Sequence, residues 1–153
     1  MAATTAQPME GLPTGLGICS TVPEAFFLPE LVFGGLVWIL VASTRVDSAN
    51  PLGWVMFVSV FCFCMTSLWM IMFMAGCHNN KSRWAAADFV YHAVAVLFYL
   101  SAAVPLSYIT ILHKTTKPFR IYQIDIAAVV FSYLAVLMYF LHAVLSSLRW
   151  KHF

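Results

Sequence analysis

The sequence predicts an all-α integral membrane protein with a bundle of four transmembrane helices. Of its 153 residues, 62% are hydrophobic and only 9% are charged, whereas a soluble domain carries roughly a quarter charged residues. Four apolar stretches, residues 25–44, 52–76, 85–112 and 126–148, each reach the length of about 20 residues that a spanning helix needs. The links between them are too short to fold separately, so residues 23–148 are expected to form one membrane domain.

Residues 1–22 precede the first stretch and are expected to form a flexible tail. They are low in charge and rich in Thr, Pro and Gly, a composition that does not support a packed core. They contain no Lys or Arg, unlike the basic start of a secretory signal. The first stretch is therefore expected to act as an uncleaved insertion signal.

Four ionisable side chains lie inside the predicted spans: Glu30, Asp88, His92 and His142. At about 1.5 Å per residue, all four lie about 5–10 Å deep in the same leaflet, because the first and third helices start where the fourth ends. The spans have no ionisable residue in the opposite leaflet. Each such group costs about 2.5–3.5 kcal/mol at the bilayer centre and marks a functional hypothesis.

Two interpretations of this intramembrane polar cluster remain open. The favoured one is structural, with Asp88 and His92 paired at positions i and i+4 of one helix and imidazoles bonding between helices. The alternative is an oligomeric ion or proton channel or transporter. Since a carrier needs polar groups across the whole membrane, a cluster confined to one leaflet favours the structural interpretation.

Small residues predict which helix faces meet, because lipid provides no hydrophobic driving force between helices. Gly34 and Gly35 mark such a face in the first span, and Ala128 and Ser132 mark one in the fourth. Packing within one chain is favoured over a dimer interface.

The four cysteines do not predict a disulfide framework. Cys77 ends the second span beside cationic residues, a setting typical of S-palmitoylation, and Cys19 is a weaker candidate of the same kind. His and Cys never recur at metal-ligand spacing on one face, and no nucleophile elbow, phosphate loop or HExxH motif is present. We therefore expect no enzyme, metal, cofactor or nucleic-acid partner.

The third link, residues 113–125, interleaves cations with aromatic residues. Lys114, Lys117 and Arg120 are candidates for contacting an anionic lipid headgroup or a partner's carboxylate, which would suit a receptor or adaptor. A solvated connector is the favoured interpretation. Lys and Arg divide four against four between the two membrane sides, so the positive-inside rule alone does not orient the chain.

Segments from all four spans resemble the MAL proteolipid family, whose members carry a MARVEL domain. The similar segments are residues 33–42, 53–61, 97–102 and 126–133, together with Asp88, Tyr91, His92 and the final Arg149, Trp150 and Lys151. The resemblance implies a four-helix MARVEL bundle with both termini cytosolic. It also implies that residues 149–153 form a cytosolic tail in which Arg149, Trp150 and Lys151 act in sorting.

The resemblance further implies residence in membranes rich in cholesterol and glycosphingolipids. The expected role is to organise membrane domains in vesicular and apical transport and in myelin, with trafficking cargo proteins as partners. The expected locations are the apical plasma membrane, the Golgi and endosomal transport vesicles. The long second and third spans suit thicker, sterol-rich bilayers, but matching contributes only fractions of a kcal/mol per Å. Homo-oligomers or clusters are therefore expected.

Overall fold

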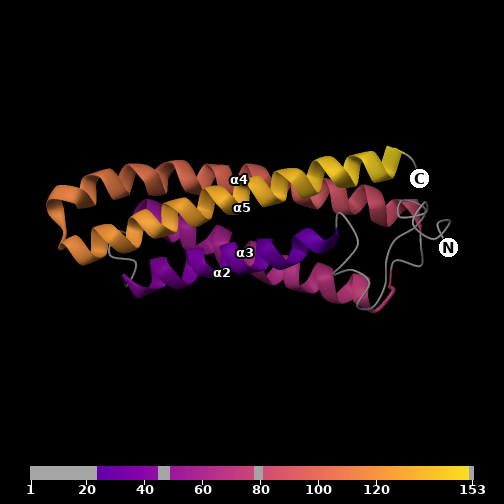
Figure 1. The fold of residues 1–153 in the computed structure, drawn as a ribbon, viewed down its shortest axis with the longest axis horizontal. Helices are drawn as coiled ribbons and strands as arrows, with labels where there is room; N and C mark the ends of the chain where they lie inside the picture. Colours follow the sequence, from indigo (N-terminus) through magenta and orange to yellow (C-terminus); the bar gives the residue numbers. More distant parts are fainter. Residues whose placement is uncertain (1–23, 45–48, 78–80, 152–153) are drawn as a thin grey trace, which may run out of the picture.

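The computed structural model describes residues 24–44, 49–77 and 81–151. The described elements are the 3-10 turn η2 (Glu24–Phe26) and the helices α2 (Phe27–Ser43), α3 (Ala49–Met74), α4 (Ser82–Thr116) and α5 (Phe119–Lys151). The helices lie lengthwise beside one another in one elongated bundle, in which η2 and the end of α5 lie toward the same end (Figure 1). The predicted all-α bundle of four helices is confirmed.

Three of the described helices are long and apolar enough to cross a membrane, over Leu52–Met74, Ser82–Thr116 and Phe119–Lys151. The fourth, α2, is shorter, with 17 residues. That length is at the lower limit of the range of about 17–25 residues for a transmembrane helix. The 3-10 turn η2 adds one further turn before it.

The last two helices extend beyond the predicted spans. α4 continues to Thr116 and α5 begins at Phe119, so only Lys117 and Pro118 join them instead of the predicted link of residues 113–125. The carbonyl of Pro118 accepts hydrogen bonds from the N–H groups of Ile121 and Tyr122, and proline suits the start of a helix because it needs no N–H partner there. The charged and aromatic link is therefore a tight turn between two helix ends.

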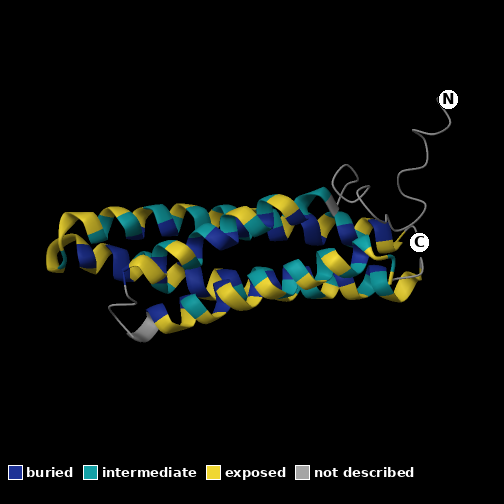
Figure 2. Ribbon diagram, turned by 90° about the horizontal axis from the view of Figure 1, so that it is seen from below, coloured by how far each residue is buried: buried dark blue, intermediate teal, exposed yellow. Residues whose placement is uncertain are grey.

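The outer surface of the bundle is apolar. Among the most exposed side chains are Leu97, at 67%, and Ile111, at 68%, and Figure 2 shows exposed segments on the outside of the bundle and buried segments toward its interior. Buried Ser, Thr, Asp, Glu, His and Arg side chains lie inside. This distribution suits a lipid environment, where polar groups turn toward the bundle interior.

Glycines allow α2 to approach its neighbours closely. A Cβ at Gly34 would lie 2.8 Å from Tyr99 Oη of α4, and a Cβ at Gly35 would lie 3.2 Å from Phe63 Cε2 of α3. Both distances are too short for an ordinary side chain, so these positions fix how near α2 can lie. In α5, two small residues predicted to pack are also buried: Ala128 and Ser132.

Candidate functional site

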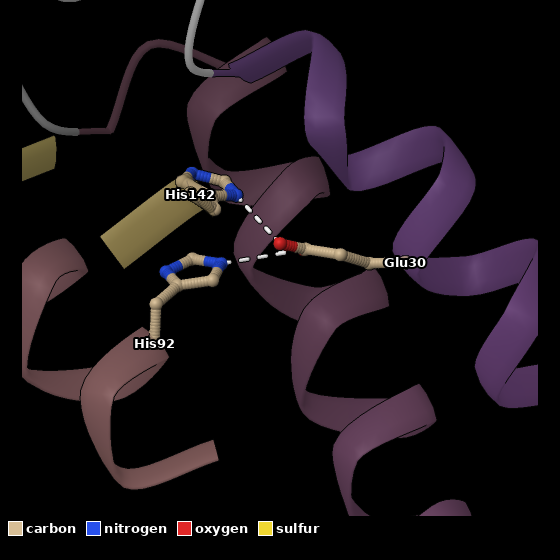
Figure 3. A group of neighbouring side chains, drawn as sticks. All are labelled: Glu30, His92 and His142. Atoms are coloured by element: carbon tan, nitrogen blue, oxygen red, sulfur yellow. Dashed lines mark hydrogen bonds and ion pairs between the residues drawn. The ribbon is translucent and has the colours of Figure 1, made fainter. Parts of the chain in front are cut away.

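The structure brings the four predicted intramembrane ionisable residues into one cluster. Glu30 comes from α2, Asp88 and His92 from α4, and His142 from α5. All four are fully buried. In Figure 3 the Glu30 carboxylate points toward both imidazoles, so the cluster connects three helices near the end of the bundle where α5 terminates.

The two imidazoles share the Glu30 carboxylate. His142 Nδ1 lies 2.8 Å from Glu30 Oε2 in a hydrogen bond, and His92 Nε2 lies 3.3 Å from Glu30 Oε1. The two rings stack with their centroids 3.5 Å apart. The ring of Phe27 packs edge-on against His142 at 4.9 Å. An apolar cover over charged groups strengthens the electrostatic interactions beneath it.

The Asp88 carboxylate accepts three side-chain hydrogen bonds. Its Oδ1 accepts a hydrogen bond from Trp69 Nε1 of α3 at 2.6 Å. Its Oδ2 accepts hydrogen bonds from Ser146 Oγ at 2.6 Å and from Arg149 Nη2 at 3.2 Å, both on α5. Asp88 therefore adds α3, the helix that Glu30 does not reach, so all four helices contribute to the cluster.

Arg149 belongs to this cluster and not to a C-terminal tail. The sequence prediction placed it with Trp150 and Lys151 in a sorting segment, but α5 continues through Lys151. Arg149 is only 1% exposed, whereas Trp150 is 46% exposed and Lys151 is also exposed. The Arg149 guanidinium lies 5.9 Å from the centre of the Phe73 ring. It also donates a hydrogen bond to the buried carboxylate of Asp88 on α4.

The net charge of the cluster follows from its members. Two carboxylates, Glu30 and Asp88, face one guanidinium, Arg149. With both imidazoles neutral, the cluster carries one excess negative charge. Because an uncompensated charge is costly in a buried site, the two histidines are where a compensating proton or cation would bind.

Hydroxyl groups extend the polar interior toward the middle of the bundle. Thr66 Oγ1 of α3 lies 2.8 Å from Tyr91 Oη of α4 and 2.7 Å from Tyr139 Oη of α5. Tyr91 also donates to the carbonyl of Cys62 at 3.2 Å. Sequence reasoning missed this group, as it missed Trp69, Ser146 and the burial of Arg149, because none of these residues is unusual in an apolar helix or at its end.

A second buried polar pair lies near the α4–α5 turn, at the opposite end. His113 Nδ1 and Asp125 Oδ2 form a hydrogen bond, with His113 3% exposed and Asp125 fully buried. Among the described residues, buried ionisable side chains therefore lie near both ends of the bundle, and sequence reasoning missed this second pair. The sequence-based spans ended at residue 112 and began again at 126, and the longer helices draw both residues into the interior.

The surface candidates stand apart from the cluster. Lys114 and Arg120 are exposed, and Lys117 is half-buried in the α4–α5 turn. Cys77 is exposed and unpaired in the turn after α3, which Gly76 closes with a φ of 74°. That turn requires a residue that tolerates a left-handed conformation. Cys19 lies outside the described residues.

Comparisons with known proteins give a consistent result. Residues 20–145 match the MARVEL family model, described as a membrane-associating domain. The chain is 47% identical to "Myelin and lymphocyte protein" of Homo sapiens over 99% of both chains and 44% identical to the protein of that name from Canis lupus familiaris, again over 99% of both. It is 34% identical to human "CKLF-like MARVEL transmembrane domain-containing protein 8" over 55% of this chain and 50% of that protein. No solved structure matches the chain significantly.

Proposed function

This chain belongs to the MARVEL family of membrane-associating proteins, and from that premise we propose that it is a non-enzymatic proteolipid that organises cholesterol- and glycosphingolipid-rich membrane domains. The proposed roles are vesicular and apical transport and the organisation of myelin membranes. The observation that carries the proposal is the apolar outer surface of the bundle, combined with its inward-facing polar groups. Such a molecule offers its largest surface to lipid chains.

Helix length supports a preference for thick bilayers. α4 has 35 residues and α5 has 33, which at about 1.5 Å per residue corresponds to about 50 Å. A typical hydrocarbon core is about 30 Å thick. Because mismatch contributes only fractions of a kcal/mol per Å, sorting by thickness would require several copies together, and we propose homo-oligomers or clusters in which cargo proteins collect.

The proposed locations follow from the same role: the apical plasma membrane, the Golgi and endosomal transport vesicles, with both termini cytosolic. Support comes from the 47% identity to a protein named for myelin and lymphocytes. The α4–α5 turn, with exposed Lys114 and Arg120, would then face the lumen or the cell exterior, where glycosphingolipid headgroups are displayed.

Lipid-phase partition tests the proposal. The purified chain is reconstituted into giant vesicles with coexisting sterol-rich and sterol-poor phases, and its distribution is imaged. We expect enrichment in the sterol-rich phase that increases with protein density, because clusters add up small matching energies. A Lys114→Glu, Arg120→Glu double variant is the matched control for headgroup attraction and should partition similarly in vesicles without anionic lipid. Equal partition of the wild type at every density would contradict the proposal.

Ion or proton conduction remains a second candidate because buried polar side chains occur at both described ends of the bundle. The test is a flux assay in sealed vesicles that contain the reconstituted chain. We expect no flux above that of empty vesicles. A reproducible flux that disappears in Asp88→Asn would replace the lipid-organising proposal.

A further inference from the structure

Three buried atoms in the cluster lack a hydrogen-bond partner: Glu30 Oε1, His92 Nε2 and His142 Nε2. The first two lie 3.3 Å apart but are not aligned for a hydrogen bond. Leaving a buried polar atom unsatisfied is destabilising, and native structures contain few such atoms. Two of these atoms, Glu30 Oε1 and His92 Nε2, face each other, which points to a ligand that both would bind.

The donor atoms are arranged closely enough to share one metal ion. Glu30, His92 and His142 each offer a ligand atom, and these atoms lie within 4.8 Å of one another. Around a tetrahedral zinc ion with bonds of about 2.0–2.2 Å, ligand atoms are about 3.3–3.5 Å apart. His142 Nδ1 lies 2.8 Å from Glu30 Oε2, and His92 Nε2 lies 3.3 Å from Glu30 Oε1. Because the two imidazole rings are stacked, at least one of them would turn to bring both nitrogens and a carboxylate oxygen onto one ion.

The other nitrogen of each imidazole faces an acceptor that would orient it as a ligand. His92 Nδ1 lies 2.8 Å from the backbone carbonyl of Asp88, which leaves Nε2 free to bind on the Glu30 side. His142 Nε2 lies 3.4 Å from Asp88 Oδ2, which leaves Nδ1 to bind on the Glu30 side. Metal-binding histidines nearly always have such an acceptor on their second nitrogen, and here one residue, Asp88, supplies both.

The chemistry of the donors selects the metal. Two imidazoles and one carboxylate are a recurrent zinc ligand set that leaves the fourth position to water or hydroxide, whereas calcium and magnesium prefer oxygen ligands alone. A zinc ion that carries one hydroxide has a net charge of +1 and would cancel the single excess negative charge of the cluster. We propose that Glu30, His92 and His142 form a zinc-binding site that fastens α2 to α4 and α5. This inference is independent of the proposed lipid function.

Zinc binding to the full chain tests the inference directly. Tag-free protein in mild detergent is stripped with a chelator, titrated with zinc in competition with a chromophoric chelator, and analysed for bound metal by atomic emission. We expect a single zinc ion per chain and a higher unfolding temperature with zinc than with the chelator. Wild-type protein that folds but binds no zinc would overturn the inference and leave a proton as the compensating charge.

Variants locate the metal. Glu30→Gln, His92→Gln and His142→Gln should each lose zinc binding, and Asp88→Asn should weaken it about 10–100-fold, as expected for the loss of an orienting acceptor. His113→Gln is the matched control, because it replaces another buried histidine, near the other end, and should bind zinc as the wild type does. Retained binding in Glu30→Gln, or equal loss in His113→Gln, would overturn the site assignment.

A cobalt spectrum of the wild-type chain decides the matter if the ligand variants fail to fold. Co²⁺ bound by two imidazoles and a carboxylate gives visible d–d absorption without intense thiolate charge-transfer bands. Absence of the d–d bands, or thiolate bands that place the metal on a cysteine such as the exposed Cys77, would overturn the inference. The partition of chelator-treated protein between the two lipid phases tests the lipid proposal separately. If that protein still concentrates in the sterol-rich phase, the lipid proposal stands even where the zinc site fails.

Discussion

Asp88 stabilises the buried cluster because its carboxylate accepts hydrogen bonds from side chains on two other helices. Trp69 precedes it by 19 positions, and Arg149 follows it by 61. The sequence identified Asp88 as unusual because a carboxylate inside an apolar span is conspicuous. Trp69 and Arg149 were not identifiable as its partners, because a Trp in a span or an Arg at a helix end has several ordinary roles.

Arg149 provides a prediction at this scale. Arg149→Ala should lower the free energy of unfolding by about 3–5 kcal/mol, because removing one partner leaves a buried carboxylate uncompensated. Lys151→Ala, two residues later and exposed, should change it by less than about 0.5 kcal/mol. Thermal or denaturant unfolding in detergent measures both. If the two variants were equally stable, Arg149 would be a tail residue after all.

Gly34 provides a second prediction. Gly34→Leu should destabilise the bundle by about 1–3 kcal/mol, since even its Cβ would lie 2.8 Å from Tyr99 Oη, and the Tyr99 ring is itself stacked 5.5 Å from Tyr139. Gly53→Leu is the control, because a Cβ there meets nothing within 4 Å. The same unfolding assay in detergent compares them. Unchanged stability in Gly34→Leu would contradict the close approach of the Tyr99 hydroxyl to α2.

At the scale of elements, the main difference between expectation and structure is the length of α4 and α5. Charged and polar residues between 113 and 125 resemble a solvated connector, yet most of them are helical and only residues 117 and 118 join the two helices. A tight turn satisfies backbone hydrogen bonds that a long loop at a membrane surface would leave to water. It also brings His113 and Asp125 together at neighbouring helix ends.

The His113–Asp125 pair gives a prediction at the scale of elements. Asp125→Ala should cost about 1–3 kcal/mol, because the buried His113 loses its acceptor. It should also speed amide hydrogen exchange in the last turn of α4 and the first turns of α5. Gln123→Ala, an exposed neighbour, is the control and should leave exchange unchanged. Unaltered exchange in Asp125→Ala would mean that the turn is held by its backbone alone.

The whole molecule presents apolar side chains outward and polar side chains inward. Buried ionisable groups occur near both described ends, with Glu30, Asp88, His92, His142 and Arg149 at one and His113 and Asp125 at the other. The start of the described chain and the end of α5 lie toward the same end of the bundle (Figure 1). A polar cluster at one end and a polar pair at the other therefore link the helices inside the bundle, while apolar side chains cover its outer surface.

Topology gives a prediction at the scale of the molecule. Epitopes at the two chain ends should both require membrane permeabilisation for antibody access, because both ends are proposed to be cytosolic. Lys114→Cys, exposed near the opposite end of the bundle, should react with an impermeant thiol reagent in intact cells. Detection of one terminus without permeabilisation would contradict an even number of crossings.

The sequence by itself determined the fold class, because hydrophobic length is a local property of each segment and four apolar stretches admit few arrangements in a bilayer. It also determined that Glu30, Asp88, His92 and His142 are buried in one half of the bundle, since depth follows from position along a helix. The family resemblance, confirmed by the MARVEL match, added the expectation that the four helices form a MARVEL bundle.

Only the tertiary structure decided which side chains meet. Helices that are apolar on nearly every face give a weak signal of how each is rotated about its axis, and contacts between distant residues depend on that rotation. The sequence therefore predicted that Glu30 and the two histidines lie in one cluster, but not which of their atoms pair. The burial of Arg149 and the His113–Asp125 pair had no sequence signature. These contacts form because exposing polar side chains to lipid is costly, so the side chains turn inward. The packing of the helices then determines which of them become hydrogen-bond partners.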